Sequence, residues 1–310
     1  MFYMDKTLLR QTILPLGAAM IWGTAFVAQY LGADTMPAFA FNAVRNFIAI
    51  WFLALVVLVF DVIRNSNPDM QKDYNHSNKD LFIGGTFSGI ALGLAMNLQQ
   101  FGIAGAGAGK SGFITTLYVV LIPVFSAFAG RKQSLRIWFS VIIAVIGLYL
   151  LCIKGDFSIE KSDVYLIGCA IMFTFQMLLV AHYVKTVDET RLSCYQFAVA
   201  AVVSAIFMII FHQIPTWDMI KSSIGPLLYT AILSSGVAYT LQVFAQKGAN
   251  TTLVSLLLCL ESVFATLSGA VFLHEKLQMR EYLGCIVMFG AVILSQLPSK
   301  NNKTEIEEEC

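Results

Sequence analysis

Long apolar runs separated by short polar segments recur along the whole chain. An α-helix of about 20 apolar residues crosses the roughly 30 Å hydrocarbon core of a bilayer. A chain in lipid must satisfy its backbone hydrogen bonds internally, and the alternation typical of membrane β-strands is absent from this sequence. We therefore predict ten transmembrane helices, at about residues 13–31, 38–60, 81–103, 112–129, 137–153, 164–184, 194–211, 224–245, 252–273 and 282–297.

The composition fits an all-α integral membrane protein. Of 310 residues, 57% are hydrophobic and 13% are charged, and 20 basic residues against 19 acidic ones leave no basic face for nucleic acid. The cysteines are scattered without CxxC spacing or clustered histidines, so we expect no disulfide framework, no metal site and no cofactor. The segment GAGAGKS (105–111) resembles a phosphate-binding loop, but Ala104 stands where that motif requires glycine.

Basic residues are distributed unequally between the two sides of the predicted bundle. The two ends and the loops on their side hold 13 Lys and Arg residues, against 6 on the opposite side. The positive-inside rule then places both termini in the cytoplasm, in a multi-pass protein of the cell membrane. The predicted organisation is a cytoplasmic N-terminus (1–12), a first five-helix unit (13–153), a second five-helix unit (164–297) and an acidic cytoplasmic tail (298–310).

The two units align with each other when short gaps are allowed. Residues 22–45 match 173–196, and Gln99 falls opposite Gln242. The matches are few, but they occur in the same helix order in both halves. Five spans per half turn the second copy upside down, which predicts two inverted repeats with a substrate site at their interface.

Four segments carry a resemblance to a known family. They are AAMIWGTAFVA (18–28), FNAVRNF (41–47), GFITTLYVVLIPVFSAF (112–128) and LESVFATLSGAVFLHEKL (260–277). Together they resemble the EamA-type transporters of the drug/metabolite transporter superfamily, over about residues 11–297. The resemblance implies a carrier of small metabolites that works by alternating access, and many such relatives are exporters. The family often has proline after the glutamate of the ninth span, where this chain has Ser262, which puts a kink there in doubt.

Glu261 is the single charge between residues 251 and 273, close to the middle of a predicted span. A carboxyl at the bilayer midplane costs about 2.5–3.5 kcal/mol, so we expect it to face a partner, a cavity or a proton path. Removal from water favours the protonated form of a carboxyl, so Glu261 is a candidate for proton coupling. The alternative is a purely structural hydrogen bond to a neighbouring helix.

Arg45 is the only charge between residues 38 and 60, and Asn42, Asn46 and Ala49 share its helical face. Arginine keeps its charge, so it needs a partner or a route to water. A structural clamp and a contact to an anionic group of the substrate both remain open. The sequence also leaves open whether Arg45 meets Glu261.

Further polar and aromatic residues inside the spans complete the predicted site. Amides can bind a polar ligand without the cost of a charge, although such residues also hold helices together. Aromatic residues within spans are as readily explained by packing. The predicted substrate-cavity or coupling residues are Trp22, Arg45, Asn97, Gln100, Thr116, Tyr118, Gln176, Gln242, Glu261 and Ser262, with Thr115 and Tyr239 beside them.

The function predicted from these features is secondary transport of small metabolites, such as amino acids or amphipathic compounds, with export as the expected direction. A gradient must drive it, and protons are one candidate, because the chain has no nucleotide-hydrolysis motif. A membrane enzyme acting on lipid-like substrates would need clustered His, Asp or Glu, which the sequence lacks, so we expect no catalytic residues. A channel or assembly subunit is a further alternative. The expected partners are a small-molecule substrate and the lipid bilayer, with a homodimer left open.

Overall fold

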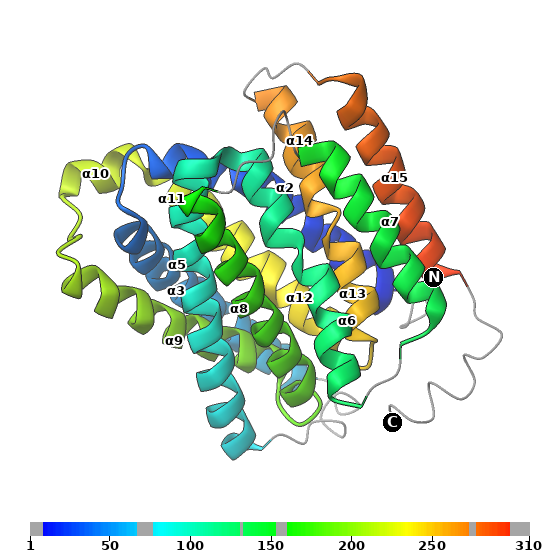
Figure 1. Ribbon diagram of the computed structural model, residues 1–310. Helices are drawn as coiled ribbons and strands as arrows, with labels where there is room; N and C mark the ends of the chain where they lie inside the picture. Colours follow the sequence, from blue (N-terminus) through cyan, green and yellow to red (C-terminus); the bar gives the residue numbers. More distant parts are fainter. Residues whose placement is uncertain (1–8, 67–76, 131–132, 153–159, 273–276, 298–310) are drawn as a thin grey trace.

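The computed structural model describes residues 9–66, 77–130, 133–152, 160–272 and 277–297, and within them all regular structure is helical (Figure 1). The first half contains η1 (Leu9–Ile13), α2 (Leu14–Ala33), α3 (Ala38–Asn65), α5 (Asn78–Thr116), α6 (Tyr118–Phe128) and α7 (Leu135–Cys152). The second half contains α8 (Lys161–Tyr183), α9 (Glu189–Ile210), α10 (Trp217–Ser222), α11 (Ile224–Leu228), η2 (Tyr229–Ala238), α12 (Tyr239–Gln246), α13 (Thr251–Leu258), α14 (Glu261–Phe272) and α15 (Met279–Gln296).

Helices occupy all ten predicted segments, which confirms the all-helical membrane fold. Eight helical stretches among the described residues are long and apolar enough to cross a bilayer. The remaining two predicted spans are α7 and α15, each of 18 residues. Residues 1–8 of the predicted N-terminal segment and the whole predicted acidic tail (298–310) lie outside the described residues.

Side chains that cap the backbone fix where several spans begin. The Asp188 carboxylate accepts the Arg191 N–H at the start of α9, and Asn250 Oδ1 accepts two backbone N–H groups at the start of α13. These caps satisfy donors that have no partner inside the helix. The third and fourth spans follow each other almost directly within α5, because Gly107 (φ 74°) interrupts the helix with a backbone conformation that suits glycine. The GAGAGKS segment is this junction.

The fourth and ninth spans are each broken in the middle. The fourth span divides at Leu117 into the end of α5 and α6, and the ninth divides at 259–260 into α13 and α14. The single helix expected over residues 251–273 is therefore two helices, although Ser262 replaces the family's proline. The break is built from tight turns instead, in which the N–H groups of Leu260 and Ser262 bond to carbonyls three residues back.

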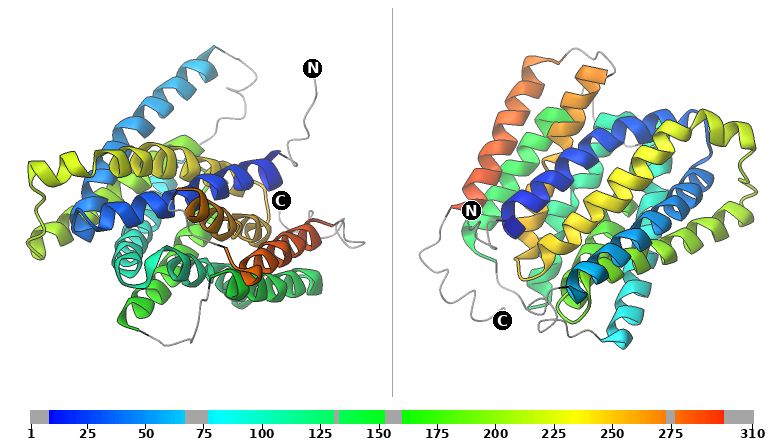
Figure 2. Two further views of the ribbon diagram at one scale, coloured as in Figure 1. Left: turned by 90° about the horizontal axis from the view of Figure 1, so that it is seen from above. Right: turned by 180° about the vertical axis from the view of Figure 1, so that it is seen from behind.

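The packing of helices repeats between the two halves. The second spans of the halves, α3 and α9, pack on each other, and so do the fifth spans, α7 and α15 (Figures 1 and 2). The contact of α2 with α14 has its counterpart in the contact of α8 with α6. Each pairing maps onto itself or its counterpart when the halves are exchanged, as expected for inverted repeats of five spans.

Large apolar side chains gather on the outside of the bundle, and polar ones lie within it. Trp51 is 68% exposed and Phe128 86%, whereas Asn46, Gln176 and Gln196 are completely buried. This is the reverse of a soluble protein and fits a surface solvated by lipid tails.

Candidate functional site

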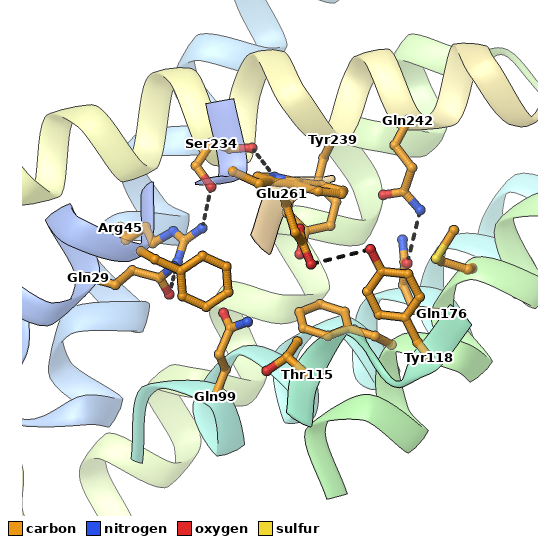
Figure 3. Close-up of a pocket in the computed structure, with 14 residues that line it drawn as sticks. Gln29, Arg45, Gln99, Thr115, Tyr118, Gln176, Ser234, Tyr239, Gln242 and Glu261 are labelled. Carbon is orange, nitrogen blue, oxygen red and sulfur yellow. Dashed lines mark hydrogen bonds between the residues drawn. The ribbon is translucent and has the colours of Figure 1, made fainter. Parts of the chain in front are cut away.

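A cavity lies between the two halves (Figure 3). Its 14 lining residues divide equally between the halves. The first half contributes Trp22, Phe26, Gln29, Arg45, Gln99, Thr115 and Tyr118, and the second contributes Phe173, Gln176, Met177, Ser234, Tyr239, Gln242 and Glu261. The cavity therefore lies where inverted-repeat transporters place their substrates.

Arg45 projects from α3 and is held by neutral oxygen atoms alone. Its side chain donates from Nε to Ser235 Oγ (2.9 Å), from Nη2 to Ser234 Oγ (3.0 Å) and from Nη1 to Gln29 Oε1 (3.3 Å). Both serines belong to η2, a π-helix, and such wide turns often occur at functional sites. A guanidinium has five N–H groups. Three are engaged here, so two remain for a ligand.

Glu261 is the first residue of α14, directly after the break in the ninth span. Its Oε1 accepts hydrogen bonds from Thr116 Oγ1 (3.1 Å) and from the Tyr118 hydroxyl (3.3 Å). These two donors flank Leu117, so the breaks of the fourth and ninth spans meet at this carboxyl. The first turn of a helix favours a negative charge. Among the described residues, no side chain donates to Glu261 Oε2, which leaves that oxygen for a ligand or a proton.

Arg45 and Glu261 line the same cavity without forming an ion pair. In Figure 3 the guanidinium points toward Gln29 and Ser234, while the carboxyl points toward Tyr118. No Asp or Glu oxygen of the described residues lies within 4.0 Å of the Arg45 nitrogens. The cavity therefore offers a cationic group and a carboxyl group at separate places on its wall.

Four buried glutamines form a hydrogen-bonded chain that begins at the cavity. Gln176 donates to Gln196 Oε1 (3.1 Å) and accepts from Gln242 Nε2 (3.3 Å), and Gln242 Nε2 also lies 3.5 Å from Gln246 Oε1. The buried Oε1 of Gln242 has no hydrogen-bond partner in the protein. A buried acceptor without a partner calls for an explanation, and a ligand N–H in the cavity would supply one.

The structure brings most of the predicted site residues together. The cavity wall contains Trp22, Arg45, Thr115, Tyr118, Gln176, Tyr239, Gln242 and Glu261. Thr116 and Ser262 lie behind the wall, where their hydroxyls are 3.0 Å apart and Thr116 bonds to Glu261. Asn97 lies between helices, where it bonds to Asn42 and Ser204. Gln100 lines a different cavity.

Several wall residues were absent from the predicted set. Phe26 and Gln29 follow Trp22 at four and seven residues on α2, a helical spacing that indicates one common face. Gln99 is the repeat counterpart of Gln242, so the internal alignment also contained its signal. Ser234 lies in a π-helix, and the 3.6-residue period of an α-helix does not predict which side chains of a π-helix point toward the cavity.

Ion pairs join the helix ends on the side predicted to be cytoplasmic. Arg64 pairs with Asp188, Arg191 with Asp61 (3.0 Å), and Lys247 with Glu189 (2.8 Å). Burial alone raises the pKa of the Asp188 carboxyl. Hydrogen bonds from the Thr190 hydroxyl and the Arg191 N–H, together with the Arg64 charge, outweigh burial and lower that pKa below its usual range. These contacts tie α3, α9 and α12 together at one end.

Comparisons with known proteins agree with this architecture. A family model described as the EamA-like transporter family matches residues 10–153 and again 160–297. The chain is 30% identical over 285 residues to an uncharacterized transporter of Archaeoglobus fulgidus, an alignment covering 90% of this chain and 83% of that protein. It is 20% identical over 293 residues to the uncharacterized transporter YoaV of Bacillus subtilis, covering 93% and 97% of the two chains.

A solved crystal structure shares the fold, with a TM-score of 0.73 at 17% identity over 92% of this chain and 96% of that one. The two family matches cover both five-helix units, and the likeness to the archaeal transporter extends over most of both chains. The protein is a multi-pass membrane transporter rather than an enzyme. Its chain belongs to the EamA-like transporter family, with two EamA repeats.

Proposed function

We propose that this protein is a secondary transporter that exports small zwitterionic metabolites, amino acids among them, across the cytoplasmic membrane. The observation that carries the proposal is the separation of Arg45 and Glu261 on the wall of one cavity between the repeats. Opposite charges that are not neutralised by each other inside a membrane protein mark a place for a ligand that bears both.

The wall chemistry suggests how such a substrate is oriented. A substrate carboxylate would take the two N–H groups of Arg45 that the protein does not engage, because arginine suits carboxylates. A substrate ammonium group would donate to Glu261 Oε2 and to the unpartnered Gln242 Oε1. Trp22 and Tyr239, whose ring centroids are 4.7 Å apart, would contact the apolar part.

Alternating access would follow from the inverted halves around this fixed site. Half-helices that end at the middle of the membrane are typical of such carriers, and here α6 and α14 both begin beside Glu261. The ion pairs of Arg64, Arg191 and Lys247 would then close the cytoplasmic end in this conformation, with both termini on that side.

Glu261 is proposed to couple transport to protons. Its carboxyl is 4% exposed and has one oxygen without a protein donor, so it can release its proton when a substrate ammonium arrives and regain it afterwards. A carboxyl that binds either a proton or a cationic ligand couples the movement of protons to the movement of substrate in the opposite direction.

The proposal is tested by efflux from proteoliposomes preloaded with an amino-acid mixture, with and without an imposed pH gradient. The expected result is saturable loss of a few compounds, faster with the gradient, whereas Glu261→Gln retains expression but loses the response to pH. The matched control is Glu281→Gln, which changes a carboxyl at the start of α15, outside the cavity. Absence of flux for every compound would favour an assembly subunit, and ion currents without saturation would favour a channel.

A further inference from the structure

A second cavity lies where α2 ends and α3 begins. Residues on its wall include Ala33, Met36 and Pro37 from this turn, Gln100 and Phe101 from α5, and Gln213 from the segment after α9. None of them lines the central cavity. It lies on the side opposite the predicted cytoplasmic ion pairs, since the α2–α3 turn and the C-terminal end of α3 are at opposite ends of one span.

Two consecutive glutamines of α5 line different cavities. Neighbouring residues of an α-helix point about 100° apart. Gln99 therefore faces the central cavity while Gln100 faces the second one. Gln100 Nε2 donates to the backbone carbonyl of Gln29 (3.1 Å), which fixes the orientation of its amide. Gln29 lines the central cavity and Gln100 the second one, so this hydrogen bond links the two walls.

The oxygen atom of the Gln100 side-chain amide is a buried acceptor without a donor. Gln100 is 1% exposed, and its Oε1 has no hydrogen-bond partner in the protein. Leaving a buried acceptor unpaired costs about 1–3 kcal/mol of desolvation, so a donor that reaches it is favoured. Because Nε2 is engaged by Gln29, Oε1 is the atom of this amide that remains to accept an N–H from a ligand in the second cavity.

The remaining wall is apolar apart from Gln213 and one helix terminus. Phe101 is held edge-on against Phe39 (ring centroids 4.9 Å apart) and lies 5.8 Å from the Tyr165 ring, which makes it a rigid aromatic surface. Pro37 caps α3 without a side-chain hydrogen bond, and Gln213 Oε1 accepts only the Phe39 N–H there. The start of a helix carries partial positive charge, which suits a carbonyl oxygen.

We propose that this second cavity binds small compounds with an aromatic or apolar body and a carboxamide group. The amide N–H donates to Gln100 Oε1, its carbonyl oxygen faces the start of α3, and the ring lies against Phe101. This assignment does not depend on the proposed transport of zwitterions, because the two cavities share no wall residue.

Photolabelling of the full-length protein in lipid nanodiscs with 4-azidobenzamide tests the proposal. Labelled peptides are mapped by mass spectrometry, and the expected adducts lie on 33–38 and 100–104. Benzamide should compete with the label, whereas methyl benzoate, of similar shape but without an N–H, should compete roughly tenfold less well, as expected for one lost hydrogen bond.

Two variants and one control separate binding from misfolding. Gln100→Leu removes the acceptor, and Ala104→Phe fills the second cavity at an exposed position, so both should reduce labelling roughly tenfold. Gln99→Leu makes the same chemical change on the adjacent residue, which faces the other cavity, and should leave labelling unchanged. The proposal is overturned if Gln99→Leu and Gln100→Leu behave alike, if adducts map to the central cavity, or if benzamide displaces no label.

Discussion

Replacing Gly23 with alanine tests how closely α2 is packed against the start of α14. A Cβ at this position would lie 2.6 Å from the Glu261 carbonyl oxygen and 2.8 Å from the Ala265 nitrogen, and it would also overlap Phe264 Cβ. Ordinary van der Waals contact begins near 3.4 Å. The two helices must therefore separate by at least about 0.8 Å, and the first atoms to move belong to Glu261 and its neighbours.

The expected cost of this overpacking is about 1–3 kcal/mol, because backbone atoms cannot rotate away as a flexible side chain could. Alanine also favours a helix over glycine by about 1 kcal/mol, so a control must carry the same benefit. Gly17→Ala, on the same helix, is that control, since its Cβ would lie 3.5 Å from Leu241 Cδ1 in ordinary contact.

Thermal unfolding in detergent, compared between the two variants, measures the overpacking alone. Gly23→Ala should be less stable than Gly17→Ala by about 1–3 kcal/mol, and it should also reduce flux because Glu261 is displaced. Equal stability of the two variants would refute the close approach of α2 and α14 at this point. Lower stability with normal flux would show that the shift does not reach the Glu261 carboxyl.

Three other substitutions have defined outcomes. Arg45→Lys keeps the charge but cannot reach three acceptors, so substrate affinity should fall about 10-fold to 100-fold in a flux titration. Asp188→Asn should cost about 1–3 kcal/mol at pH 7. Because the pKa of Asp188 is lowered in the folded protein, its contribution to stability is complete above the unfolded pKa near 3.9 and is lost as pH falls through the folded pKa. The difference in melting temperature between Asp188→Asn and wild type should therefore vanish in acid. Asp218→Asn, at an exposed position, should change the melting temperature little at any pH. Gln176→Leu leaves the buried Gln196 Oε1 without its donor and removes one acceptor of Gln242 Nε2, so the protein should lose about 1–3 kcal/mol of stability, measured as a lower melting temperature.

The helical framework could be predicted because apolar length alone determines whether a segment can cross a bilayer. It was harder to predict which individual side chains point into the central cavity. These spans are apolar on all sides, so no polar face distinguishes Gln99, which lines the central cavity, from Gln100, which does not. The break before Glu261 escaped prediction for another reason, because tight turns produce it without the proline that marks such sites.

Because Arg45 has only neutral hydrogen-bond partners, the net charge of the central cavity depends on the protonation of Glu261. With only serine and glutamine oxygens around it, the guanidinium keeps a full positive charge inside the membrane span. The central cavity therefore has a net charge of about +1 when Glu261 is protonated and about zero when it is ionised. One charge that crosses the whole membrane exchanges about 2.3 kcal/mol with each 100 mV of potential. The proton on Glu261 thus decides whether the membrane voltage acts on the empty site at all.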